Sequence, residues 1–216
     1  DKTATAYNGR PISYAGFVRL IAGACRDLER RGCSGPGYAL LALHNLLDFW
    51  ILSLALRSLG LTTAMSRVSA PLQLLDVLDV RCVVTTPEET KWSGLEGLCA
   101  SAGVPFVSLA PRHEIPDASP GLSLPPTIGG HVLRTSGTTG QDKLVLMTPA
   151  MDGLFLRRKV AANRMDRDSV LCAFGFLPWS AAGYRWAASP WAVGATTLRE
   201  QGDKPYLALM RPGITH

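Results

Sequence analysis

The stretch HVLRTSGTTGQDKLVLMT, residues 131–148, decides the fold and carries the strongest functional signal in the chain. Short apolar runs at 132–133 and 144–147 flank residues 135–143, which are almost wholly threonine, serine and glycine with one lysine. This pattern predicts two strands joined by a small, flexible loop. Glycines let backbone N–H groups approach an anion closely, hydroxyls add donors, and Lys143 adds positive charge. The loop is therefore typical of a phosphate site.

Two other interpretations of the loop must be weighed against phosphate binding. Threonine and glycine are common in ordinary turns between strands, and composition alone leaves that interpretation open. The P-loop of nucleoside triphosphatases, G-x-x-x-x-G-K-[ST], does not fit. Here the two glycines are three apart, two residues separate Gly140 from Lys143, and Leu144 stands where the P-loop needs a hydroxyl. The spacing therefore excludes a P-loop.

The composition is that of a globular protein. The 216 residues allow one large or two small domains, and 47% of them are hydrophobic while 18% are charged. The net charge of +5 suits an anionic ligand such as a phosphate ester. Five cysteines without a CxxC spacing predict reduced thiols in a cytoplasmic protein. The four histidines are far apart in sequence, so we expect no metal site.

No segment of this sequence predicts secretion or a membrane span. Residues 1–10 lack the basic start and apolar core of a signal peptide. The most apolar stretch, 38–61, is interrupted by polar residues such as Asp48 and Arg57, so it is too polar to cross a bilayer. We expect a buried strand followed by a buried helix there.

Strand and helix patterns alternate before the loop. Asn8-Gly9 between two β-prone arms predicts a tight hairpin turn. A helical period starts at Tyr14 and stops at Gly32, which predicts an amphipathic helix. Further strands are expected near 38–43, 63–66, 81–86 and 104–109, and further helices near 46–60, 71–78 and 94–102. Such alternation predicts an α/β fold, with a mainly parallel sheet inside a three-layer αβα arrangement.

Prolines divide the chain. Five of them between 111 and 126 remove hydrogen-bond donors and disfavour helix. We expect a first α/β subdomain at 1–110, a proline-rich linker at 111–130, and the loop with a partial second α/β subdomain at 131–216. The last part should contain a helix near 149–165, a strand near 169–175, a helix over 180–194 that breaks at Pro190, and a strand near 196–200.

The loop sequence TSGTTGQDK resembles the phosphate-binding signature TSGTTG-x-P-K-G of the adenylate-forming superfamily. This superfamily contains acyl-CoA and aryl-CoA synthetases, the adenylation domains of nonribosomal peptide synthetases, and luciferases. Four flanking segments resemble the family in the same order, at 12–32, 38–61, 174–183 and 191–200. The resemblance therefore covers essentially the whole chain, and it implies a truncated N-terminal domain of the adenylate-forming fold.

The resemblance implies an acyl-CoA synthetase-like ligase. In this chemistry a carboxylate attacks the α-phosphorus of ATP to give an acyl adenylate and pyrophosphate, and a thiol, usually that of CoA, then takes the acyl group. Donors in the loop would stabilise charge on the pyrophosphate. Matched to the motif, the ATP phosphate-binding residues are Thr135, Ser136, Gly137, Thr138, Thr139, Gly140 and Lys143. The implied ligands are ATP, Mg, CoA and a small carboxylic acid or fatty acid.

The sequence departs from the family pattern at several positions. Asp142 replaces the proline of the signature and Leu144 its last glycine. Trp179 and Ser180 stand where many members have a histidine or another aromatic residue, so these two and Gly183 are candidates for the acyl pocket. A tryptophan at this point fits a plain core position equally well.

Members of the family are typically more than twice as long as this chain. The segments that hold adenine, ribose and Mg, and the catalytic lysine, would follow residue 216, so we expect a fragment that is inactive alone. A noncatalytic nucleotide-binding or scaffold module and an adenylation domain of a peptide synthetase are the alternatives. Nucleic acid is the least favoured partner, because no aromatic stacking platform accompanies the basic segment 157–167. An unpaired sheet edge leaves homo-oligomer formation open.

Overall fold

The computed structural model divides the chain into two compact units. It describes residues 1–66, 72–75, 77–111, 126–136, 142–178, 180–200 and 213–216. One unit consists of Asp1–Val18 with Ala150–His216, and the other of Arg19–Pro149. These bounds differ from the segments 1–110, 111–130 and 131–216 expected from the sequence, because the first strands pair with the C-terminal part of the chain.

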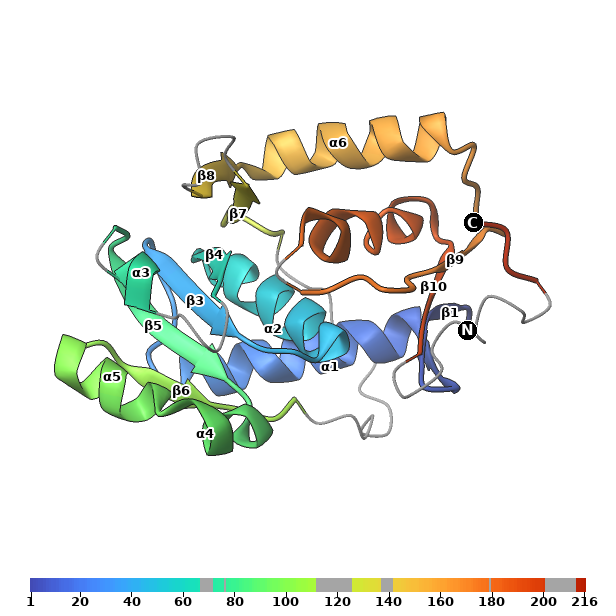
Figure 1. Cartoon of the computed structure of the whole chain (residues 1–216). Helices are drawn as coiled ribbons and strands as arrows, with labels where there is room; N and C mark the ends of the chain where they lie inside the picture. The colour runs from blue at the N-terminus through green and yellow to red at the C-terminus, as the bar shows by residue number, and fades with distance from the viewer. Residues whose placement is uncertain (67–71, 76, 112–125, 137–141, 179, 201–212) are drawn as a thin grey trace. The chain divides into compact units, whose positions relative to one another are not determined.

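The unit of Arg19–Pro149 is built on a six-stranded sheet with the order β6-β5-β3-β4-β7-β8 (Figure 1). Its strands are β3 (Tyr38–Ala42), β4 (Thr62–Met65), β5 (Val80–Thr85), β6 (Phe106–Ser108), β7 (His131–Ser136) and β8 (Asp142–Met147). All neighbours run parallel except β7 and β8, which are antiparallel. Its helices are α2 (Leu46–Ser58), α3 (Leu72–Leu75), α4 (Pro87–Ser93) and α5 (Leu95–Ala102), together with the larger part of α1 (Tyr14–Glu29).

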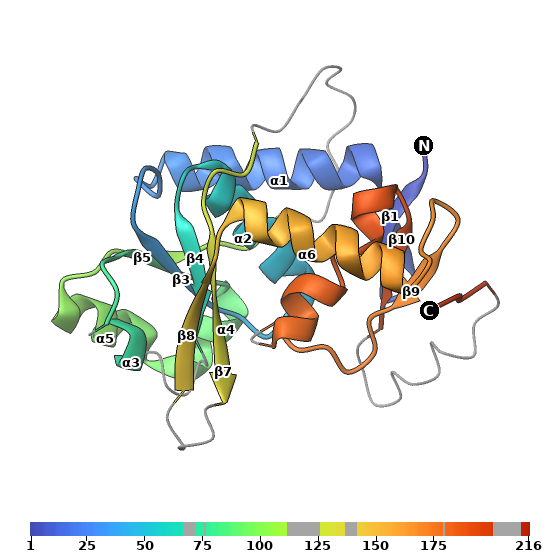
Figure 2. The same cartoon turned by 90° about the horizontal axis from the view of Figure 1, so that it is seen from above.

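Alternating side chains decide which helices cover each face of this sheet. Leu40 of β3 and Val83 of β5 share a core with Leu74 of α3 and Cys99 of α5. Helix α2 packs against β3 and β4 from the other face, and Figures 1 and 2 show these helices on opposite sides of the sheet. Almost every residue of α2 is buried, as its uniformly apolar sequence predicts. The expected mainly parallel, three-layer arrangement is therefore confirmed.

The other unit contains a four-stranded sheet with the order β2-β1-β10-β9. Its elements are β1 (Thr3–Tyr7), β2 (Arg10–Ser13), α6 (Pro149–Ala162), β9 (Val170–Cys172), a π-helix η1 (Ala182–Trp186), a 3-10 helix η2 (Pro190–Val193) and β10 (Thr196–Arg199). The predicted hairpin is confirmed, since Asn8 and Gly9 have φ of 50° and 77° between antiparallel β1 and β2. Strand β1 is also parallel to β10.

The observed helices can be compared with the expected ones at three places. Helix α4 was not expected, although Pro87 at its first turn and the acidic residues Glu88 and Glu89 are helix-start signals. The break expected at Pro190 within 180–194 is confirmed, since η1 ends at Trp186 and Pro190 begins η2, although both helices are shorter than expected. Helix α6 ends at Ala162 rather than near residue 165.

Candidate functional site

Strands β7 and β8 form the hairpin that carries the predicted phosphate loop. Because β7 runs parallel to β4, its C-terminal end lies at the carboxyl edge of the parallel strands. The register pairs Thr135 with Lys143 and Ser136 with Asp142. The chain therefore leaves β7 and enters β8 at the sheet edge where α/β proteins most often bind ligands.

Thr135 and Lys143 are the predicted phosphate-binding residues whose side chains the structure describes. Both are exposed, and the Thr135 hydroxyl donates to the Lys143 carbonyl oxygen at 3.5 Å. Residues 137–141, which include Gly137, Thr138, Thr139 and Gly140, lie outside the described residues, and so does the side chain of Ser136. The structure therefore brings Thr135 and Lys143 together as cross-strand partners, a pairing that sequence spacing does not give.

A buried polar network fixes the base of this hairpin. His131, the first residue of β7, is 1% exposed, and its Nδ1 lies 2.8 Å from the Thr63 hydroxyl of β4. The Thr63 hydroxyl is also 3.3 Å from Ser53 Oγ of α2. The ring of Phe49 meets the His131 ring edge-on, with the centroids 6.0 Å apart. These contacts hold β7 against β4 and α2.

Close backbone contacts just before β7 add to this support. Arg57 is buried, and its Nε donates to the Gly129 carbonyl oxygen at 2.9 Å, while the Gly129 N–H donates to the Arg57 carbonyl oxygen at 2.9 Å. A Cβ at Gly129 would lie 1.8 Å from the Leu61 carbonyl oxygen, so only glycine fits. Sequence reasoning missed this anchor, although the adjacent Gly129 and Gly130 were a readable signal of close approach.

Two of the three acyl-pocket candidates make contacts where the chain enters η1, Ser180 just before it and Gly183 within it. The Ser180 hydroxyl donates to the Leu177 carbonyl oxygen at 2.7 Å and accepts from the Gly183 N–H at 2.9 Å. Gly183 is buried, and a Cβ there would lie 2.0 Å from the same carbonyl oxygen. Trp179 lies outside the described residues. Ser180 and Gly183 therefore set the shape of this segment.

Charged and aromatic side chains link α6 to η1. The Tyr184 hydroxyl donates to Asp152 Oδ2 at 2.5 Å, and both residues are buried. Arg185 Nε lies 3.7 Å from Asp152 Oδ1. Lys159 Nζ lies 4.2 Å from the centre of the Trp186 ring, a cation–π distance. At least one cation of the basic segment 157–167, Lys159, therefore packs against an aromatic ring of the same unit.

The remaining candidates for chemistry are few. Among the residues that the structure describes, no group of three or more His, Cys, Asp or Glu side chains could hold a metal ion. All five cysteines are free thiols, and Cys25 is the one that is not fully buried. None of the helices within the described ranges is long and apolar enough to cross a membrane.

The similarities to known proteins lie in the fold. No protein-family model and no curated protein matches the sequence. Solved structures with a similar fold are adenylate-forming enzymes, and the chain has the fold of their N-terminal domains.

Three of these structures show the extent of the likeness. ATP-bound MatB from Rhodopseudomonas palustris matches 97% of the chain at a TM-score of 0.77 and 21% identity. The N-terminal subdomain of Klebsiella oxytoca NpsA, in complex with 3-hydroxyanthranilyl-AMSN, matches 97% at a TM-score of 0.68 and 17% identity, and 52% of that chain is covered. A putative long-chain-fatty-acid CoA ligase from R. palustris matches 97% at a TM-score of 0.70 and 16% identity, with 56% of that chain covered. The present chain spans 44% of the MatB chain.

Proposed function

We propose that the chain is the amino-terminal part of an ATP-dependent, acyl-CoA synthetase-like ligase. The enzyme would activate a carboxylic acid as its acyl adenylate and transfer the acyl group to the thiol of CoA. One observation carries this proposal: the sequence TSGTTGQDK joins β7 to β8 at the carboxyl edge of a sheet whose fold is shared with ATP-bound MatB.

The loop would bind the β- and γ-phosphates of ATP. Lys143 is exposed at the start of β8, so its ammonium group is free to meet an anion above the sheet edge. The hydroxyls and backbone N–H groups of Thr135, Ser136, Gly137, Thr138, Thr139 and Gly140 would add donors. Together they would stabilise the negative charge that develops on the leaving pyrophosphate.

A Mg ion would accompany the nucleotide, and its protein ligands are proposed to lie outside this chain. Among the described residues, no group of three or more His, Cys, Asp or Glu side chains gathers to hold it. Mg typically keeps several waters and binds substrate phosphates with one or two carboxylates. We propose that this chain supplies the phosphate-binding loop, and that other segments of the enzyme contact adenine and CoA.

The segment 174–183 is proposed as one wall of the acyl pocket. Phe174 and Leu177 are large apolar residues that stay 41% and 42% exposed after β9. Ser180 and Gly183 would hold this segment in shape, and Trp179 would complete the wall. An apolar wall suits a fatty or aromatic acid. A cytoplasmic location is proposed with it, because free cysteines are typical of a reducing compartment.

Binding of pyrophosphate and ATP to the chain tests the proposal. Lys143→Ala should weaken pyrophosphate binding about tenfold, as expected for the loss of one charge-assisted contact. Arg30→Ala removes the same charge from an exposed position on the C-terminal side of α1 and should leave the affinity unchanged. If Lys143→Ala and the unaltered chain bind pyrophosphate with equal affinity in calorimetric titration, the assignment of the phosphate loop is wrong.

A second assay separates the ligase from a noncatalytic module. We expect no carboxylate-dependent exchange between ATP and pyrophosphate from the chain alone, because it would supply the phosphate grip without the rest of the site. Exchange that depends on Lys143 would show that the chain is active by itself. The remaining segments of the proposed ligase can then be added to the chain. If ATP binds and still no exchange between ATP and pyrophosphate occurs, the noncatalytic module is favoured.

A further inference from the structure

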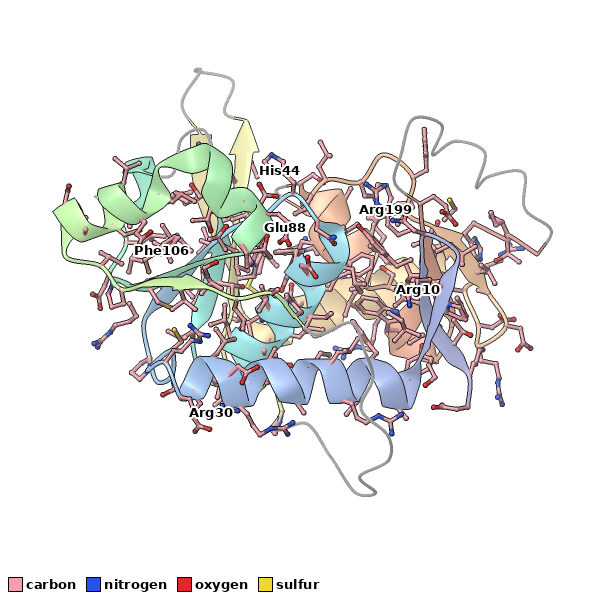
Figure 3. All side chains as sticks on the ribbon, turned by 90° about the horizontal axis from the view of Figure 1, so that it is seen from below. Arg10, Arg30, His44, Glu88, Phe106 and Arg199 are labelled. Atoms are coloured by element: carbon pink, nitrogen blue, oxygen red, sulfur yellow. The ribbon has the colours of Figure 1, made fainter. Side chains whose placement is uncertain are left out.

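Two arginines flank a buried tyrosine at one edge of the four-stranded sheet. Tyr7 ends β1, and its cross-strand partners are Arg10 of β2 and Arg199 of β10. Directly opposed residues on neighbouring strands project to the same face of a sheet, so these side chains form one row. We call it the Arg10–Tyr7–Arg199 row, and Figure 3 labels both of its arginines.

Arg199 is a buried cation with little to compensate its charge. It is 8% exposed, and its Nη1 donates to the Ala173 carbonyl oxygen at 2.9 Å. Its Nε is enclosed and has no hydrogen-bond partner among the described residues. The ionisable groups that act on it are the Tyr7 phenol and the Cys172 thiol, neither of which is a carboxylate. Burial lowers the pKa of the Arg199 guanidinium, so desolvation outweighs the support from these neighbours.

A buried arginine whose charge is not compensated is expected to bind an anionic group. Arginine is almost never fully buried unless it is paired, because burial removes the water that stabilises its charge. The described part of the chain gives Arg199 a carbonyl oxygen and no acidic group. Among the described residues its Nε therefore remains a donor that an anionic ligand could use.

The place in the fold fits a ligand. Tyr7 and Arg199 are the last residues of β1 and β10, which run parallel, so the row lies at the carboxyl edge of these strands. That edge is where ligands of α/β proteins are most often bound. Arg10 is exposed on β2 and Arg199 is buried on β10, with Tyr7 of β1 between them. The row therefore offers one cation accessible to solvent and one whose Nη1 is held by the Ala173 carbonyl oxygen.

We propose that the Arg10–Tyr7–Arg199 row is an anion-binding site, separate from the phosphate loop, that takes a carboxylate or a phosphate group. Arg199 would supply charge in a largely desolvated setting, and Arg10 would close on the anion from the solvent side. Guanidinium groups suit both anions, because their donors match pairs of carboxylate or phosphate oxygens. The site belongs to the unit of Asp1–Val18 and Ala150–His216, whereas the phosphate loop belongs to the other unit.

Calorimetric titration of the full chain with succinate and with inorganic phosphate tests this site. The arginine variants are compared in the Lys143→Ala background, so that binding at the phosphate loop does not contribute. The unaltered chain is titrated beside them, and sodium chloride keeps the ionic strength constant. Arg10→Gln should weaken binding about tenfold, the loss expected for one charge-assisted contact. Arg30→Gln is the matched control, since Arg30 is an exposed arginine of the other unit and should leave the affinity unchanged.

Each outcome has a defined meaning. Tighter binding of succinate than of phosphate would assign the site to a carboxylic acid, and the reverse would assign it to a phosphate ester. Either result supports the proposal if Arg10→Gln weakens the binding. Arg199→Lys, which keeps a charge but loses the fork of donors, should also weaken binding if it folds. Equal weak binding by the Lys143→Ala chain with and without Arg10→Gln would overturn the proposal, and Arg199 would then serve only to hold Ala173. Binding that disappears in the Lys143→Ala background would instead place the anion on the loop and overturn this site.

Discussion

Replacing Gly183 with alanine tests the backbone packing that shapes the segment 174–183. A Cβ there would lie 2.0 Å from the Leu177 carbonyl oxygen and 2.7 Å from its carbonyl carbon, where real Cβ contacts stay above 3.0 Å. The two backbone segments would therefore have to separate by about 1 Å. Overpacking of this kind costs about 3 kcal/mol, while alanine gains about 1 kcal/mol over glycine in helical backbone. We expect the free energy of unfolding to fall by about 2 kcal/mol.

Urea denaturation followed by circular dichroism measures this loss, and Gly153→Ala is the matched control. Gly153 lies inside α6 of the same unit, and a Cβ there would meet only Arg157 Nη1 at 3.5 Å, an ordinary contact. That substitution should raise the free energy of unfolding by up to about 1 kcal/mol. If Gly183→Ala proves as stable as the unaltered chain, residues 177 and 183 do not approach as described and the proposed wall of the acyl pocket loses its support.

Three further perturbations follow from single contacts. Asn45→Ala should lower the free energy of unfolding by about 1 kcal/mol, because Asn45 Oδ1 accepts two backbone N–H groups at the start of α2, and Asn45→Ser should recover most of it in the same urea assay. Tyr184→Phe should lower the free energy of unfolding by about 2 kcal/mol, because it removes the hydroxyl that donates to the buried Asp152 carboxylate at 2.5 Å, and an unchanged urea midpoint would contradict that bond. Burial raises the pKa of Tyr14 to about 12 from 10.0, so its protonated hydroxyl supports folding below pH 10.0 and this support is lost as the pH rises to about 12. Tyrosinate absorbance of Tyr14→Phe should lack this late titration, and a step in the unaltered chain complete near pH 10 would refute it.

Much of the local structure could be predicted from the sequence. Asn8-Gly9 predicts a turn because few residue pairs accept two positive φ angles, and both residues adopt them. The apolar run before Asn45 and the all-round apolar helix after it predict β3 and α2, which are buried as expected. The two apolar arms around TSGTTGQDK predict β7 and β8. These signals are short-range, since period, turn chemistry and capping act within a few neighbouring residues.

The candidate site was predictable in its residue types and not in its surroundings. The sequence of residues 135–143 indicates which side chains and backbone groups of the loop could donate hydrogen bonds to phosphate. Their assignment as phosphate-binding residues stays a prediction. Nothing in the spacing shows that Thr135 faces Lys143, or that His131 binds Thr63 beneath them. Those contacts depend on strand register, which is set by the packing of the whole sheet.

Tertiary structure alone decided which distant segments meet. The pairing of β1 with β10 joins residues near 5 to residues near 197, and it gathers the two ends of the chain into one unit. In sequence, Arg199 is an ordinary polar residue at the end of a strand, yet that pairing buries it beside Tyr7. Local preference fixes the elements because it depends on neighbours along the chain, whereas burial and charge compensation depend on neighbours in space.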